Sequence, residues 1–216
     1  MSAKLTAYLD EGSDERVYLV GGWLGKDGVW AEFSRAWTDE LRSPPTIAYF
    51  KNNDALGLKN QFAGWTEESR DGKLLRLAEI IANRELVGLV GGVGIAKFKT
   101  LFASSIVPKR KLRAIIKFTE PYHFGAQCVV SVTLGYQIKK AKNFTDQLDF
   151  VFDEGVRFLS DCVANYPKLK SVLPPEAAGT IKSDNDRLTP PIQAADMLVG
   201  RSFTRSPLPC RRARSA

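Results

Sequence analysis

The chain has 216 residues, of which 44% are hydrophobic and 25% are charged. This composition excludes a disordered chain, and a globular chain of this length buries about 70% of its unfolded surface without disulfides or structural zinc. An excess of Lys and Arg (31) over Asp and Glu (24) gives a net charge of +7, which is compatible with a nucleic-acid partner.

Two strands are expected near the N-terminus. Residues 4–10 alternate apolar and polar side chains and run into the turn sequence Asp-Glu-Gly-Ser, and residues 17–23 are mostly β-branched and aromatic. The two segments therefore predict strands that pair through that turn. Apolar residues at helical spacing predict a helix over 28–41, which the following Ser-Pro-Pro ends. A short third strand is expected over 46–50.

The middle of the chain continues this alternation. A helix is predicted over 66–84, with Thr66 as its N-cap before two glutamates. The apolar, glycine-rich run over 86–98 predicts a buried strand, because its glycines lie within a strand pattern and no P-loop Lys-Ser or Lys-Thr follows them. Residues 111–140 are expected to be helical in part.

The last third predicts a strand over 148–152, a helix over 155–166, a strand over 179–182 and a final helix over 192–203. Strands that alternate with helices indicate an α/β architecture, in which helices pack on a central sheet. No repeat or linker divides the chain. We therefore expect one domain over residues 1–205, followed by a basic and disordered tail over 206–216.

The sequence predicts a cytoplasmic protein that does not enter a membrane. Its longest nearly uncharged apolar stretch, residues 86–96, is far shorter than the roughly 20 residues that span a bilayer, and acids interrupt the first apolar run before it could form a signal peptide. Cys128, Cys162 and Cys210 are scattered and odd in number. This pattern indicates a reducing compartment and no disulfide or zinc framework.

Basic residues gather in two segments. The first contains Lys109, Arg110, Lys111 and Arg113, and the second is the arginine-rich tail after Asp196. Such clusters are typical of proteins that bind a phosphate backbone, so we expect the first segment to contact nucleic acid. A solvated helix face and a ragged terminus would explain the same composition.

Acidic residues stand at the ends of predicted strands. Asp10 and Asp153 each follow an apolar strand, which places them at the edge where α/β sheets bind ligands. Asp196 lies on the last helix in apolar surroundings, where an unpaired carboxylate is costly, and Gln193 projects from the same helix face. Asp10, Asp153 and Asp196 can therefore converge from two strands and one helix.

Converging carboxylates repel one another and favour a cation between them. Oxygen ligands without His or Cys suit Mg²⁺ or Mn²⁺, and two such ions can activate a water and stabilise the leaving oxygen of a phosphodiester. Taken one at a time, each of these acids could equally be a turn or cap residue.

Three segments resemble a known family. Residues 8–14 (Tyr-Leu-Asp-Glu-Gly-Ser-Asp), followed by Val-Gly-Gly at 20–22, resemble the Tyr-Leu-Asp-Glu-Ser-Gly-Asp opening of the bacterial and phage proteins grouped as domain of unknown function 3800. Residues 191–200 resemble that family's Pro-Leu-Gln-x-Ala-Asp ending, and residues 150–154 resemble its hydrophobic strand capped by Asp-Glu. The resemblance extends over residues 7–203.

The resemblance implies a ribonuclease H-like fold, with a mixed central sheet flanked by helices and an acidic, metal-binding site. Asp10, Asp153 and Asp196 take the places of the family's acidic cluster as catalytic residues and metal ligands. Their neighbours Glu11, Glu154 and Gln193 take supporting places.

The sequence departs from the family pattern at two points. Glu-Gly-Ser at 11–13 stands where the family has Glu-Ser-Gly, and Lys51 stands at the position where the family often has a His followed by an acid. Asp54 is therefore the candidate fourth metal ligand, with Glu79 on the second helix as its rival.

These observations predict a metal-dependent phosphodiesterase or nuclease that uses Mg²⁺ or Mn²⁺ and acts on nucleic acid. One alternative is a catalytically idle member of the same fold that binds nucleic acid or a protein. Another is a small-nucleotide hydrolase, which would not need the basic tail. The residues do not distinguish DNA from RNA and leave the oligomeric state open.

Overall fold

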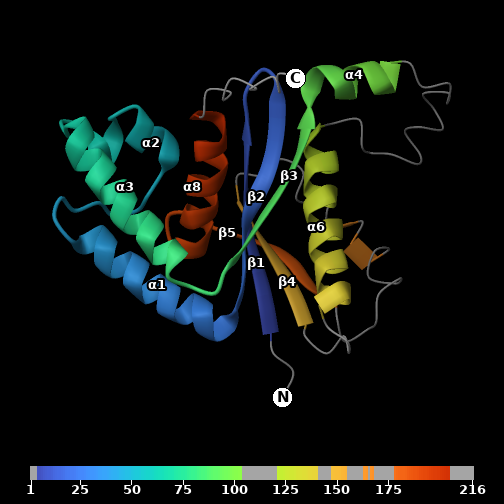
Figure 1. The fold of residues 1–216 in the computed structure, drawn as a ribbon, viewed down its shortest axis with the longest axis horizontal. Helices are drawn as coiled ribbons and strands as arrows, with labels where there is room; N and C mark the ends of the chain where they lie inside the picture. The colour runs from blue at the N-terminus through green and yellow to red at the C-terminus, as the bar shows by residue number, and fades with distance from the viewer. Residues whose placement is uncertain are drawn as a thin grey trace, which may run out of the picture.

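The computed structural model describes residues 4–103, 121–140, 147–154, 163–164, 166–167 and 178–204. These residues form a single α/β domain in which helices cover both faces of a five-stranded mixed sheet (Figure 1). The expected α/β architecture is thus confirmed. No helix in this part of the chain is long and apolar enough to cross a membrane.

The sheet has the strand order β3-β2-β1-β4-β5. Its strands are β1 (Lys4–Ser13), β2 (Val17–Lys26), β3 (Val87–Gly94), β4 (Gln147–Asp153) and β5 (Ala178–Asp184). β2 pairs antiparallel with both β1 and β3, whereas β4 pairs parallel with both β1 and β5. The carboxyl ends of β1, β4 and β5 therefore meet at one edge of the sheet.

Two groups of helices cover the sheet (Figure 1). One face carries α1 (Asp27–Arg42), α2 (Asn52–Leu56), the 3₁₀ turn η1 (Asn60–Phe62), α3 (Glu67–Ala82) and α8 (Pro190–Thr204). The other face carries α6 (Pro121–Lys140), and α4 (Ile95–Ala103) follows β3. In the first group α8 makes the most extensive contact with β1 and β2, and α1 also reaches β1, where Trp30 Nε1 donates to the carbonyl oxygen of Thr6 at 2.9 Å.

Strand alternation divides the core into two clusters. In β1, Leu5, Ala7 and Leu9 face α6 and belong to one cluster, whereas Tyr8 packs with the other cluster, among α1, α3 and α8. Because side chains alternate along a strand, Asp10 points to the same face as Tyr8. The sheet therefore separates an apolar α6 side from a second core on whose edge the acidic side chains lie.

Most predicted elements are confirmed, including β1, β2, α1, β4, β5 and α8. The N-cap of α3 is also confirmed, because the backbone N–H of Ser69 donates to Thr66 Oγ1 at 3.1 Å. α6 confirms the helix expected within 111–140, of which residues 111–120 lie outside the described residues. The predicted helix over 155–166 lies almost entirely outside the described residues, as do the basic residues 109–117 and the tail from residue 205.

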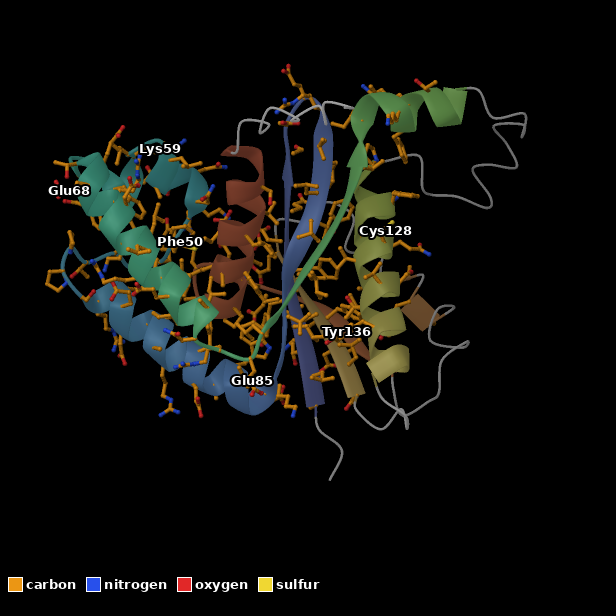
Figure 2. All side chains as sticks on the ribbon, viewed as in Figure 1. Phe50, Lys59, Glu68, Glu85, Cys128 and Tyr136 are labelled. Atoms are coloured by element: carbon orange, nitrogen blue, oxygen red, sulfur yellow. The ribbon has the colours of Figure 1, made fainter. Side chains whose placement is uncertain are left out.

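The predicted strand over 46–50 is wrong. This segment is irregular, and side-chain amides take the place of a neighbouring strand. The backbone N–H groups of Ala48 and Tyr49 donate to Gln61 Oε1, and that of Phe50 donates to Gln193 Oε1 at 3.0 Å. Phe50 itself is buried among the helices (Figure 2). The apolar pattern therefore indicated burial correctly, but the backbone groups find partners outside a sheet.

The predicted buried strand over 86–98 is too long and is not fully buried. β3 ends at Gly94, and Ile95 begins α4. In the described sheet β3 is an edge strand, and Val90 is 54% exposed. Gly91 of β3 allows close packing, because a Cβ at this position would lie 2.7 Å from Val129 Cγ2 and 3.1 Å from the Gly125 carbonyl oxygen of α6. The uncharged sequence over 86–96 is thus explained by the packing of β3 on α6 and not by a central position in the sheet.

Candidate acidic site

Asp10 and Asp153 lie side by side on adjacent parallel strands. The register of β1 and β4 pairs Leu9 with Phe152, and both of these side chains face α6. The next residue on each strand therefore points to the opposite face, toward α8. The sequence-predicted pair is thus placed at one edge of the sheet by the register and the alternation of side chains.

Asp196 approaches this edge from α8. Gly21 is paired with Asp10 across β1 and β2, and a Cβ on Gly21 would lie only 3.2 Å from Val199 Cγ2 and 3.0 Å from the Leu89 carbonyl oxygen. Glycine therefore lets α8 pack closely on the sheet beside Asp10. Asp196 Oδ2 accepts a hydrogen bond from the backbone N–H of Asn52 at 2.7 Å, which fixes this carboxylate.

Asp10 is the most strongly perturbed acid of the site. It is 6% exposed, and burial together with the charge of Asp196 raises its pKa to about 8, with a smaller contribution from Asp153. The backbone N–H of Glu11 donates to Asp10 Oδ1 at 2.8 Å and opposes part of this shift. Burial and the neighbouring charges therefore favour the protonated form of Asp10 when no cation is bound.

The other two carboxylates share this environment. Burial raises the pKa of Asp196, and the charges of Asp186 and Asp153 add to the shift against the hydrogen bond from Asn52. Burial likewise raises the pKa of Asp153, followed by the charge of Asp186. Each carboxylate thus lies within electrostatic range of another, as expected if the three converge.

Asp186 is a fourth acid that sequence reasoning missed. It lies in the turn between β5 and α8, directly after the acidic sequence Ser183-Asp184-Asn185. The rule that selected Asp10 and Asp153, an acid just after a strand, points to Asp184 after the predicted strand over 179–182 and not to Asp186, which lies four residues beyond the end of that strand. We refer to Asp10, Asp153, Asp186 and Asp196 as the acid cluster.

Lys51 supplies positive charge to the acid cluster. Its ammonium forms a short hydrogen-bonded ion pair with Asp186 Oδ2, and its side chain is 33% exposed. Burial lowers the pKa of Lys51, but the bond to Asp186 and the charges of Asp196 and Asp10 outweigh burial and raise it above its ordinary value. Lys51 therefore stays charged. The sequence marked this position only through the departure from the family's His.

Gln193 holds the loops around the cluster in place. It is 1% exposed, and its Oε1 accepts hydrogen bonds from Trp37 Nε1 at 2.9 Å and from the backbone N–H of Phe50 at 3.0 Å. Its Nε2 donates to the carbonyl oxygen of Asp186 at 2.8 Å. One amide thus connects α1, the segment before Lys51 and the turn of Asp186, which gives Gln193 a positioning role.

The remaining predicted residues lie around the cluster or away from it. Glu11 accepts a hydrogen bond from the Tyr18 hydroxyl at 2.6 Å, and burial and this bond raise the pKa of Tyr18. Glu154 is exposed and accepts from Asn185 Nδ2 at 3.2 Å. Asp54 is buried and accepts from Asn60 Nδ2 of η1 at 2.9 Å, and Glu79 is exposed on α3.

The oxygen donors of the cluster suit a hard cation, but the carboxylates are not arranged around a common point as in a metal site. Asp10 and Asp196 each use one carboxylate oxygen in a backbone hydrogen bond and, within the described part of the chain, have the other available. Oxygen donors of this kind are ligands for Mg²⁺ and Mn²⁺. Among the residues that the structure describes, no group of three His, Cys, Asp or Glu side chains is arranged to hold an ion. In this arrangement Lys51 provides the positive charge.

No protein-family model matches this chain, and no curated protein is significantly similar to it. The resemblance of its motifs to domain of unknown function 3800 therefore stays a prediction, and the function of the chain must be inferred from the acid cluster.

Proposed function

We propose that the chain is a metal-dependent phosphodiesterase that cleaves nucleic acid at the acid cluster. The observation that carries this proposal is the burial of Asp10 beside Asp196 and Asp153, which raises its pKa to about 8. A protein that buries repelling carboxylates at a sheet edge keeps them at a cost in stability, and a bound cation would offset that cost.

A ribonuclease H-like fold is part of the proposal. It is supported by the mixed sheet with helices on both faces and by the two acids at the ends of the neighbouring parallel strands β1 and β4. The third acid comes from the last helix, in the position that the motif resemblance implies.

Mg²⁺ or Mn²⁺ would be held by Asp10, Asp153 and Asp196, and when bound it supplies activation of a water and stabilisation of the leaving oxygen. The protein's own residues prepare this site. The backbone N–H groups of Glu11 and Asn52 orient the carboxylates of Asp10 and Asp196. Gln193 positions the turn of Asp186 and the segment that carries Lys51.

The net charge of +7 supports a polyanionic substrate. Lys109, Arg110, Lys111 and Arg113 are the residues that we propose to contact the phosphate backbone. They lie outside the described residues, so their part in the proposal rests on the sequence alone.

The test is cleavage of a panel of single- and double-stranded DNA, RNA and hybrids in the presence of Mg²⁺ or Mn²⁺. Asp10→Asn and Asp196→Asn should each slow cleavage by about two orders of magnitude or more, because each removes a charged oxygen ligand where a metal stabilises the transition state. Asp39→Asn, an exposed change on α1 with the same loss of charge, should leave the rate unchanged. Wild-type protein that cleaves no member of the panel would refute the proposal.

The idle-binder alternative is favoured by one observation, namely that Lys51 already neutralises part of the cluster. In that case the wild-type chain would bind members of the same panel without cleaving them, with or without a divalent ion. Binding and cleavage measured on one panel therefore separate the two functions.

A further inference from the structure

The positive charge of Lys51 interacts with the acid cluster as a bound cation would. Its charge acts on the carboxylates of Asp10, Asp153 and Asp196 and lowers the pKa of each against the effect of burial. Its ammonium also forms the ion pair with Asp186. A single cationic side chain thus interacts with every member of the acid cluster.

The charges of this arrangement do not balance. Four carboxylates carry a formal charge of −4 when ionised, and Lys51 contributes +1. The net formal charge of −3 leaves negative charge that a divalent ion could offset, and that ion would compete with the ammonium for the charge of the cluster.

The segment that carries Lys51 is rigidly held. Phe50 just before it bonds to Gln193, and Asn52 just after it bonds to Asp196 through its backbone N–H. A Cβ on Gly200 of α8 would lie 1.9 Å from Asn52 Nδ2, so glycine at this position lets the segment approach α8 closely. Packing on both sides of Lys51 thus directs its side chain into the cluster.

From this geometry we infer that Lys51 is a built-in counter-cation of the acid cluster, which offsets charge that a divalent ion would otherwise offset. The inference rests on the proposed cation-binding role of the cluster. It means that the wild-type cluster binds a divalent ion less tightly than the carboxylates alone would. Lys51 is a positioning and charge-balancing residue in this role.

The experiment replaces Lys51 by Gln and measures Mn²⁺ binding by titration calorimetry and by the Mn²⁺ electron paramagnetic resonance signal. Lys51→Gln should bind Mn²⁺ about tenfold more tightly than wild-type protein, a factor within the usual range of coupling between two interacting ligands. In EDTA its melting temperature should fall by about 5 °C or more, because buried carboxylates lose their counter-charge. Mn²⁺ should then raise the melting temperature of the variant more than that of the wild type.

Two control variants separate this role from a general loss of charge or of packing. Lys59→Gln removes the same charge from an exposed position at the outer end of the helical layer (Figure 2) and should leave Mn²⁺ affinity unchanged. Lys51→Arg keeps the charge and should keep wild-type Mn²⁺ affinity. If Lys51→Gln does not fold in EDTA, the double variant Asp186→Asn/Lys51→Gln, which also removes the carboxylate that pairs with Lys51, should fold there.

A Lys51→Gln protein with wild-type or weaker Mn²⁺ affinity would overturn the inference, as would failure of the double variant to fold. The outcome is independent of the proposed activity. If the variant gains Mn²⁺ affinity but neither protein cleaves nucleic acid, the role of Lys51 stands and the phosphodiesterase proposal fails.

Discussion

Asp10 should make the stability of the metal-free protein fall as pH rises. Its pKa is about 8 in the folded chain against 3.8 as the ordinary value, so between these values the folded chain retains a proton that the unfolded chain has released. The unfolded state then binds fewer protons, and the free energy of unfolding decreases with pH by up to about 1.4 kcal/mol per unit. Over the whole window the loss amounts to about 5–6 kcal/mol at most.

Asp10→Asn tests this reasoning, because the amide resembles the protonated carboxyl and does not titrate. The variant should match the wild type near the ordinary pKa of Asp. It should become progressively more stable than the wild type as pH rises, and the difference should level off above about pH 8. Urea unfolding in EDTA between about pH 4 and pH 9 measures the difference directly.

The exposed Asp39→Asn variant is the matched control, since it changes the net charge equally and should follow the wild-type curve. Asp153 and Asp196 also have raised pKa values and remain in both Asp10→Asn and the wild type. Their contribution therefore largely cancels in the comparison. Parallel stability curves for Asp10→Asn and the wild type across this window would refute the assignment of a buried, protonated Asp10.

Two further substitutions probe how the cluster is held. Gln193→Leu should lower the free energy of unfolding by about 2–4 kcal/mol in urea, because the buried donors of Trp37 and Phe50 lose their acceptor; a loss below about 1 kcal/mol would contradict its positioning role. Gly200→Ala should cost about 1–3 kcal/mol, because the added Cβ would lie 1.9 Å from Asn52 Nδ2. Gly135→Ala on α6 is the control, because a Cβ at this position meets nothing within 4 Å. In the same assay it should be neutral or stabilising by up to about 1 kcal/mol. Equal effects of the two glycine substitutions would contradict the close contact at Gly200.

The positions of Asp10 and Asp153 could be predicted because they depend on local rules. An apolar strand followed by an acid fixes both the strand and the point where it ends, and pairing of parallel strands then brings the two acids together. Asp196 was predicted from the cost of a carboxylate in an apolar helix, which is again a property of its immediate neighbours.

Lys51 and Asp186 could not be chosen in the same way. Lys51 lies in an irregular segment whose shape is set by the amides of Gln61 and Gln193, which are distant in sequence. Propensity rules favoured a strand over 46–50 because they register apolar side chains and ignore such partners. Asp186 acquires its importance from the ion pair with Lys51, so neither residue stands out until the helical layer is docked on the sheet.

The acid cluster and its counter-charge Lys51 are assembled from residues 10, 51, 153, 186 and 196, which span nearly the whole described chain. Contacts between such distant residues form only after long loops have closed, and loop closure loses entropy before the contacts return any free energy. β1 and β4 must pair, the segment of Lys51 must dock and α8 must pack before the last carboxylate is in place. A cation that binds the complete cluster therefore stabilises the fully folded chain and no partly folded form of it. The affinity of the chain for that cation therefore reports how completely the fold is assembled, and not the stability of any single helix or strand.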